Sequence, residues 1–433
     1  MKLILLELNE INFDAVRFYL EKGISLPGFE ILLSGHFLTT KAESTYENLE
    51  PWIQWPSVHT GKTYEEHGVF RLGDFVNSKD EQFFEKIEKA GFNVGAISPM
   101  NASNNLNRPA YFIPDPWTKT STDGSFLSNN LAAGISQAVN DNSQSKVTFF
   151  TISRLIFAFI KLANVRSFYS VALFAITAVG KSWRRALFLD IFLYEIHKGL
   201  VRRNNPDFST LFLNAGAHIQ HHYFFNSRFV SSSKLVNPSW YIKNNEDPFL
   251  EMLKVYDKIL IDVVGYPDTE VIVATGLSQK PYEELKFYYR LKDHKAFLNT
   301  IGVTFRDVFP RMTRDFEIIF DTESEAIAAE LVLSSIFIDN KIRLFDEIDN
   351  RGRGLFVVLT YPCEITKNTV MTLSETNFLL IELVSFVAIK NGEHQSKGFA
   401  YFSEGLKGLA PSQDSHVSEI HNTVLDFFRV PRK

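Results

Sequence analysis

Short apolar segments alternate with helical segments along this chain, and this alternation constrains the fold more than any other feature. Residues 3–8 have the composition of a buried strand, and residues 13–22 that of the helix after it, closed by Gly23. Further strands with helices before them are expected at 92–98, 209–213 and 270–274. Such alternation predicts an α/β fold, in which a mostly parallel central sheet carries helices on both faces.

The length of 433 residues is too great for one ordinary compact domain. After about residue 288 the segments PRMTRDFEIIF, SEAIAAELVLSSIF and RLFDEIDNRGRGLFVVLTY predict strand, helix and a two-stranded ribbon that turns at 350–354. We expect an α/β core of residues 1–288 and 376–433 with a helical insertion at about 147–201. A small α+β cap is expected at 289–375.

Charge and cysteine content exclude several classes of protein. A net charge of -5 and a pI near 6.2 provide no basic excess for phosphate neutralisation, so a nucleic-acid binder is not expected. Cys363 is the single cysteine, which excludes an intramolecular disulfide or a cysteine metal cluster. The N-terminal MKLILLELNEINFD lacks the apolar stretch and cleavage site of a secretory signal, so we expect a cytoplasmic protein.

Two interpretations of segment 147–201 stay open. The segment places Lys161, Arg166, Lys181, Arg184 and Arg185 among aromatic and aliphatic residues, including Trp183. Its longest uncharged run is too short to span a bilayer, but such a surface can rest on an anionic membrane. The alternative is a helical hairpin that packs on the domain or on the partner subunit of a homodimer, because apolar helix faces usually belong to a core.

Three histidines follow one of the apolar strands. In DFSTLFLNAGAHIQHHY, a helix that begins near Ala217 brings His218 within reach of both His221 and His222 on its surface. Neutral imidazoles bind zinc, manganese and iron, and ligands of open α/β sheets bind beyond the carboxyl ends of the strands. The alternative is a polar helix start whose histidines form hydrogen bonds to loops.

Several segments, in order, resemble the alkaline phosphatase superfamily, in particular its type I phosphodiesterase/nucleotide pyrophosphatase branch. These are LLELNEINFDAVRFYLEKGISLPGFEILLSG, WPSVHTGKTYEEHGVF, STLFLNAGAHIQHHY, VIVATGLSQ and NGEHQSKGFAYFSEG. They cover the core to about residue 285 and again from about 380 to 410. The resemblance implies metal-assisted phosphoryl transfer, with paired cations and a Thr or Ser nucleophile.

The chain has only some of the residues that this resemblance leads us to expect. Asn9 stands at the aspartate position of the first strand, and Thr275 with Gly276 replaces an Asp-His pair. The family nucleophile falls at 50–52, where this chain has no Thr or Ser; Ser57 and Thr60 are the next hydroxyls. Side chains alternate along a strand, so Glu7 and Asn9 are expected on one face and Glu10 on the other.

The resemblance therefore implies one rebuilt metal site. We expect a single divalent ion, zinc with manganese or iron as alternatives, on His218, on His221 or His222, and on His394. The candidate catalytic residues are Asn9, Glu10, Glu50 and Ser57, and the candidate substrate-binding residues are Trp52, His59 and Thr275.

The function expected from this resemblance is that of a metal-dependent hydrolase or transferase acting on a small phosphate or sulfate ester, such as a nucleotide-linked sugar or a glycan precursor. The alternative is a catalytically silent relative that binds a ligand or a partner protein, and that can rest on a membrane through segment 147–201. The missing nucleophile and the missing Asp-His pair motivate this alternative.

Overall fold

The structure is a computed structural model that describes residues 1–140, 149–162, 171–172, 174–311, 314–373 and 376–432. The chain forms two compact units. The core unit comprises Met1–Phe229, Glu246–Lys280 and Gly392–Lys433, and the inserted unit comprises Val230–Asn245 and Pro281–Asn391. The inserted unit comprises more residues than the expected cap at 289–375, because it includes most of the two long connecting strands and a second segment, Val230–Asn245.

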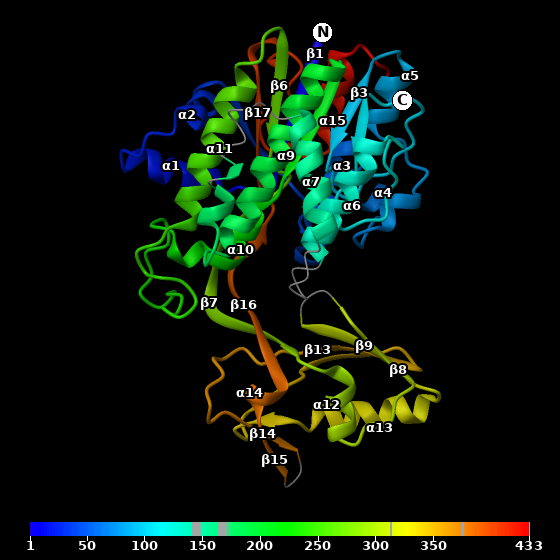
Figure 1. Cartoon of the computed structure of the whole chain (residues 1–433), viewed down its shortest axis with the longest axis vertical. Coiled ribbons are helices and arrows are strands. Elements are labelled where there is room, and N and C mark those ends of the chain that lie inside the picture. The colour runs from blue at the N-terminus through cyan, green and yellow to red at the C-terminus, as the bar shows by residue number, and fades with distance from the viewer. Residues whose placement is uncertain (141–148, 163–170, 173, 312–313, 374–375, 433) are drawn as a thin grey trace. The chain divides into compact units, whose positions relative to one another are not determined.

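The core unit contains an eight-stranded sheet in the order β18-β2-β17-β6-β1-β5-β3-β4 (Figure 1). Its strands are β1 Lys2–Leu8, β2 His36–Lys41, β3 Val94–Ile97, β4 Tyr111–Ile113, β5 Phe208–Leu213, β6 Thr269–Ala274, β17 Lys397–Phe402 and β18 Ser415–His416. Within this sheet only β17 runs against the other strands. The predicted α/β class with a mostly parallel sheet is confirmed.

The helices of the core unit pack on both faces of this sheet (Figure 1). They are α1 Phe13–Glu21, α2 Pro27–Ser34, α3 Pro51–Thr60, α4 Tyr64–His67, α5 Phe83–Lys89, α6 Phe126–Asn140, α7 Phe149–Leu162, α9 Trp183–Asn204, α10 Ala215–Tyr223, α11 Pro248–Val264 and α15 Glu419–Phe427. On one face Leu3 and Leu5 of β1 share a hydrophobic cluster with Trp55, Phe84 and Val424. On the other face α9 contacts β5 and α11 contacts β6. Burial of β1 on both faces explains its nearly continuous apolar sequence.

The register of the central strands determines where their ends meet. Leu8 at the end of β1 pairs with Leu213 at the end of β5, and Glu7 pairs with Ala274 at the end of β6. These three parallel strands therefore end at the same edge of the sheet. Residues that follow them in the chain are brought together there.

The segment around 149–204 is helical where it is described. Helix α7 packs on α6 and α9, and α9 packs on α10 and α11. Two of its basic residues form ion pairs inside the core unit, Lys181 with Glu246 at 2.7 Å and Arg184 with Glu251 at 2.6 Å. Arg166 lies outside the described residues. Among the described helices, none has the length and apolar character required to cross a bilayer.

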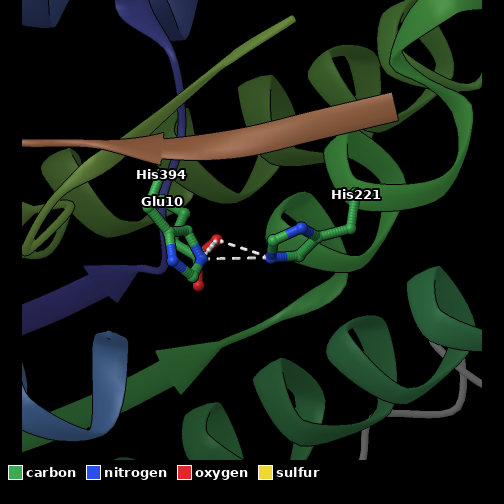
Figure 2. Close-up of side chains that lie close together, drawn as sticks. All are labelled: Glu10, His221 and His394. Atoms are coloured by element: carbon green, nitrogen blue, oxygen red, sulfur yellow. Dashed lines mark hydrogen bonds and ion pairs between the residues drawn. The ribbon is translucent and has the colours of Figure 1, made fainter. Parts of the chain in front are cut away.

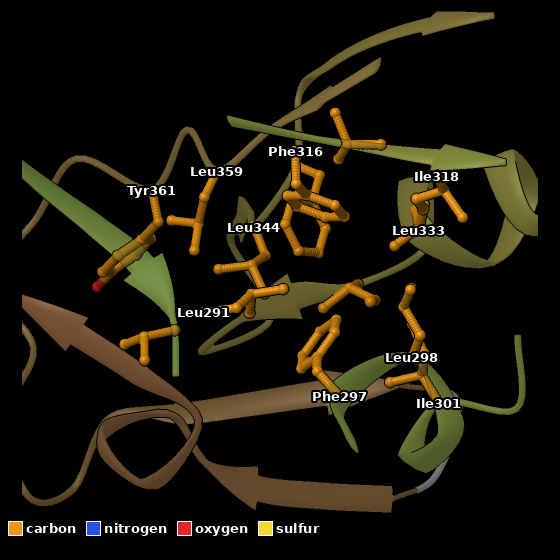
Figure 3. Close-up of a cluster of buried hydrophobic side chains, with 14 of the residues drawn as sticks. Leu291, Phe297, Leu298, Ile301, Phe316, Ile318, Leu333, Leu344, Leu359 and Tyr361 are labelled. Carbon is orange, nitrogen blue, oxygen red and sulfur yellow. The ribbon is translucent and has the colours of Figure 1, made fainter. Parts of the chain in front are cut away.

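The inserted unit has its own hydrophobic core (Figure 3). Its antiparallel strands are β8 Asp307–Pro310, β9 Asp315–Ile319, β10 Phe337–Ile338, β11 Ile342–Arg343, β12 Glu347–Asn350, β13 Gly354–Val358, β14 Val370–Leu373 and β15 Thr376–Leu379, in two four-stranded sheets. The predicted ribbon that turns at 350–354 is the β12–β13 pair. Helices α12 His294–Thr300 and α13 Glu323–Ser334 contribute Phe297 and Leu333 to the core.

Two long strands, β7 Ser278–Leu291 and β16 Val384–Gln395, pair with one another and carry the chain into and out of the inserted unit. The last residues of β16 belong to the core unit. Gly392 is required there, because a Cβ atom at this position would lie 2.1 Å from Gln279 Oε1 and 2.8 Å from the Gln220 carbonyl oxygen. This close approach brings β16 beside α10.

Candidate metal centre

Glu10 lies just beyond the end of β1, in a left-handed backbone conformation with φ of 63°. This conformation is unfavourable for a residue with a Cβ atom, and it persists only where the surroundings determine it. The Glu10 amide donates to the Thr275 carbonyl at 3.1 Å. Its own carbonyl accepts from the Gln279 amide at 3.2 Å and from Gln220 Nε2 at 2.9 Å. Three segments of the core unit thus hold the backbone of Glu10.

The Glu10 side chain meets two histidines from distant parts of the sequence (Figure 2). Its Oε2 atom lies 3.1 Å from Nε2 of His221 on α10 and 3.1 Å from Nε2 of His394 on β16. The two Nε2 atoms are 3.2 Å apart. One carboxylate oxygen and two imidazole nitrogens therefore form a nearly equilateral triangle.

This triangle fits a single divalent metal ion. Zinc bonds of about 2.0–2.1 Å in a tetrahedral arrangement separate neighbouring ligand atoms by roughly 3.3–3.4 Å, close to the separations observed here. Two imidazoles and one carboxylate with an open fourth position form a ligand set of catalytic zinc sites. The same set also suits iron. The side chains of Glu10 and His394 are 2% and 11% exposed, whereas that of His221 is 34% exposed, so the cluster is open on the side of His221.

His394 is oriented by groups on the other side of its ring. Nδ1 of His394 lies 3.6 Å from Oε2 of Glu50, and the backbone of Leu49 also forms a hydrogen bond with this histidine. Burial lowers the pKa of His394, but the Glu10 carboxylate and then Glu50 outweigh burial, so the pKa lies above its ordinary value. An imidazole whose Nδ1 side faces a carboxylate and a carbonyl presents Nε2 as the metal ligand.

The Glu10 carboxylate is buried but remains ionised. Asn9 Nδ2 donates to Oε1 at 2.9 Å, and Gln279 Nε2 donates to Oε2. Burial raises the pKa of Glu10, but the interactions with His394 and His221 outweigh burial and hold the pKa well below its ordinary value. Among the described residues, neither lysine nor arginine forms an ion pair with this carboxylate, so imidazolium or a metal ion must balance its charge.

His218 and His222 do not belong to this cluster, which corrects the expected set of three histidines. On α10, residues 218 and 222 differ by about 40° around the helix axis and share one face, whereas 221 is about 100° from 222. The rings of His218 and His222 lie 4.6 Å apart, centroid to centroid. Burial, with a smaller contribution from His221, lowers the pKa of His218 to about 4, and burial lowers the pKa of His222 well below its ordinary value. Glu10 supplies the third atom of the triangle instead.

Asn9 supports Glu10 and is bound on every polar atom. Its Oδ1 accepts from Trp55 Nε1 at 2.8 Å, and its Nδ2 donates to Asn214 Oδ1 at 2.8 Å as well as to Glu10. The strand ends at Leu8, so the expected alternation of faces does not extend to Glu10. Asn9 and Glu10 therefore meet at the same place, while Glu7 stays in the interior.

Four residues near the cluster were not expected from the sequence. Gln220 and Gln279 hold the backbone and carboxylate of Glu10, Asn214 binds Asn9, and Gly392 admits β16 beside them. Asn214 directly follows an apolar strand, and this position could have identified it as a candidate site residue. The two glutamines carry no comparable signal, because their neighbours in space come from other segments.

Ser57 is fully buried on α3 and has no activating base. Its Oγ lies 3.0 Å from Nε2 of His67. Nδ1 of His67 accepts the Val69 amide at 3.0 Å, so the neutral ring carries its proton on Nε2 and donates it to Ser57. Burial lowers the pKa of His67 to about 4, which keeps the ring neutral. Ser57 in turn donates to the Ile53 carbonyl at 3.3 Å, so its hydroxyl forms hydrogen bonds inside the fold and its catalytic role stays a prediction.

Of the three expected substrate-binding residues, Thr275 contacts Glu10 through its backbone carbonyl, whereas the side chains of all three bind other groups of the core unit. His59 is fully buried with Nε2 at 3.3 Å from Glu7 Oε1, within the interior of the core unit. The Thr275 hydroxyl is buried and accepts the Phe399 amide at 2.9 Å. Trp52 is half-buried, and its indole N–H donates to the Phe70 carbonyl at 3.1 Å. These bonds lie inside the core unit, although Nδ1 of His59 is buried without a hydrogen-bond partner, and the assignment of the three residues to substrate stays a prediction.

No protein-family model and no curated protein sequence matches the chain. Several solved structures are similar to it. Phosphonoacetate hydrolase from Sinorhizobium meliloti 1021 is 13% identical, with a TM-score of 0.40 and coverage of 98% of this chain and 95% of that chain. Murine ectonucleotide pyrophosphatase/phosphodiesterase 5 is 8% identical, with a TM-score of 0.37 and coverage of 100% and 96%. The alkaline phosphatase of the Antarctic bacterium TAB5 is 10% identical, with a TM-score of 0.40 and coverage of 99% and 98%. Sequence identities and TM-scores this low do not indicate the activity of this chain.

Proposed function

We propose that Glu10, His221 and His394 bind one divalent metal ion, with zinc preferred, and that the chain is a metal-dependent hydrolase of phosphate esters. The observation that carries this proposal is the triangle of Glu10 Oε2, His221 Nε2 and His394 Nε2, with sides of 3.1, 3.1 and 3.2 Å. Such spacing brings a buried carboxylate and two imidazoles together in the way that a metal ion would require.

The charge of the site favours a singly charged ester. Glu10 and Glu50 place two carboxylates around His394. With one divalent ion bound to neutral imidazoles, these charges sum to about zero, and a phosphomonoester dianion would gain little attraction. A phosphodiester or a sulfate monoester carries a single negative charge and suits this balance better. The resemblance of the sequence to type I phosphodiesterases supports the phosphodiester.

The residues of the cluster divide into ligands and supports. A bound ion would polarise the ester oxygen and lower the pKa of water, which is the chemistry that a site without a hydroxyl nucleophile needs. Asn9 and Gln279 hold the Glu10 carboxylate, and Glu50 orients the His394 ring. The cluster is open beside the partly exposed His221, so substrate would enter from that side.

Metal content and hydrolysis, measured on the same preparations, test this proposal. Metal per chain would be determined by inductively coupled plasma mass spectrometry for wild type, His221→Ala and His222→Ala. The last variant is a matched control, because it removes a neighbouring histidine of the same helix that lies outside the triangle. Bis(p-nitrophenyl) phosphate, p-nitrophenyl phosphate and p-nitrophenyl sulfate would serve as substrates.

We expect about one ion per chain in wild type and in His222→Ala, and loss of the ion in His221→Ala. Hydrolysis of the diester should follow metal content and exceed that of the monoester. Equal metal content in wild type and His221→Ala would rule out the proposed ligand set.

A second candidate function is a metal-binding protein without catalytic activity. It is favoured by the hydroxyl groups of Ser57, Thr60 and Thr275, which form hydrogen bonds inside the fold and supply no nucleophile. One ion per chain with no turnover of any of the three esters would favour this function over hydrolysis.

A further inference from the structure

The inserted unit contains a small cavity of about 120 Å³ that is lined mainly by aromatic and aliphatic side chains. Its walls come from the 230–245 segment, from β7 and β16, from α14 Leu380–Leu383, and from the loop after β13. The lining residues are Trp240, Tyr289, Glu364, Ile365, Ile381, Val384 and Phe386. Because pockets for whole drug-sized ligands measure roughly 300–1,000 Å³, this cavity admits one chemical group rather than an entire nucleotide.

The ring of Phe386 is steeply inclined to two other aromatic rings that line this cavity. The rings of Trp240 and Phe386 have centroids 5.0 Å apart and planes at 80°. Those of Tyr289 and Phe386 have centroids 6.0 Å apart and planes at 73°. Trp240 is 54% exposed, although an indole of this size usually loses most of its surface on folding. These rings pack edge to face against one another, and a group bound in the cavity would lie beside them.

The polar atoms of the cavity select the charge of that group. Trp240 Nε1 donates to Glu364 Oε1 at 2.7 Å, and the Tyr289 hydroxyl accepts the Ile365 amide at 2.9 Å. None of the lining residues is a lysine, an arginine or a histidine. The cavity therefore combines one carboxylate with aromatic rings, both of which can attract cations, and none of its lining side chains is cationic.

We propose that this aromatic cavity binds the methylated ammonium group of a small soluble molecule. A quaternary ammonium has an apolar methyl surface that suits the rings and a positive charge that suits Glu364 and the π faces. A sugar ring would require several hydrogen-bonding partners, and Glu364 is the single charged group of the lining. This binding site does not depend on the proposed metal centre.

Isothermal titration calorimetry of the full chain would test the proposal with tetramethylammonium, choline and the neutral choline analogue 3,3-dimethylbutan-1-ol. We expect saturable binding of both cations with a Kd of about 1 mM or lower, and at least roughly tenfold weaker binding of the alcohol. No saturable binding of either cation, or equal binding of choline and the alcohol, would overturn it. Binding to phosphatidylcholine vesicles without binding to choline would overturn the assignment to a small molecule.

Four variants locate the site. Trp240→Leu should weaken choline binding at least roughly tenfold. Glu364→Gln retains an acceptor for the indole N–H and should weaken binding about fivefold, so it remains informative if the Trp240 variant unfolds. Phe309→Ala removes another exposed aromatic ring of the same unit, 46% exposed, and should bind as wild type does. His394→Ala should also bind as wild type does, which separates this site from the metal centre. Unchanged affinity in both Trp240→Leu and Glu364→Gln would refute the assigned cavity.

Discussion

Nε2 of His394 lies 3.1 Å from Oε2 of Glu10, although 384 positions separate the two residues in the sequence. The contact requires two features of the tertiary structure. Glu10 turns out of β1 through a left-handed conformation, and β16 returns from the inserted unit to pass beside α10.

Removal of the metal should destabilise the folded chain. An ion that binds only the folded state at about 100 times its Kd stabilises that state by about 2.7 kcal/mol. Dialysis against a chelator should therefore lower the melting temperature of wild type, and addition of zinc should restore it. Differential scanning calorimetry would measure both. His394→Ala should show neither change. A wild-type melting temperature that does not change when the metal is chelated would contradict the proposed site.

Glu50→Gln should weaken metal binding through His394. Glu50 faces Nδ1 of that histidine, and loss of such a partner typically costs about 10–100-fold in metal affinity. A competition titration with a chromogenic zinc chelator would give the affinity. Glu47→Gln is the control, because Glu47 is an exposed glutamate three positions earlier. Equal affinities of Glu50→Gln and wild type would show that Glu50 does not orient His394.

Ser57→Ala should retain hydrolysis of the diester. His67 donates its Nε2 proton to Ser57, so this pair cannot generate an alkoxide. We expect kcat within about twofold of wild type and a loss of about 1 kcal/mol in the free energy of unfolding for the missing hydrogen bond. Steady-state kinetics and urea denaturation would measure the two quantities. A decrease in kcat of a hundredfold or more would instead identify Ser57 as the nucleophile.

Asp190 should make stability depend on pH. Burial raises the pKa of Asp190 from 3.8 to about 6, against the hydrogen bonds from Tyr256, Ala215 and Asn214. Between these values the folded chain binds more protons than the unfolded chain, so the free energy of unfolding decreases as pH rises. The contribution is fully present below pH 3.8 and is lost above about pH 6; it amounts to at most about 3 kcal/mol.

Comparison with Asp190→Asn isolates that contribution. The free energy of unfolding of wild type, minus that of the variant, should decrease from pH 4 to pH 7. Urea denaturation at each pH would determine it. A difference that is independent of pH would show that the pKa of Asp190 is not raised in the folded chain.

The sequence predicted the central strands because each is a local apolar run. Strands β1, β5 and β6 lie within two residues of their expected bounds, since burial on both faces requires apolar residues at almost every position. Helix α1 ends before Gly23 as expected, and α13, with its capping box of Thr322 and Glu325, begins one residue before its expected segment. These features depend on neighbours in the chain.

The composition of the candidate metal site was decided by tertiary structure. The sequence pointed to α10 and to His394, but it did not show which histidine of α10 faces the end of β1. That choice depends on how α10 packs against the sheet. Nor did it show that Glu10 replaces a histidine, because the strand pattern placed Glu10 on the opposite face. Backbone hydrogen bonds to Thr275, Gln279 and Gln220 hold Glu10 in its left-handed conformation, and these partners lie more than 200 residues away in the chain. Local sequence thus determined the secondary structure and its class, while long-range hydrogen bonds and packing determined the site.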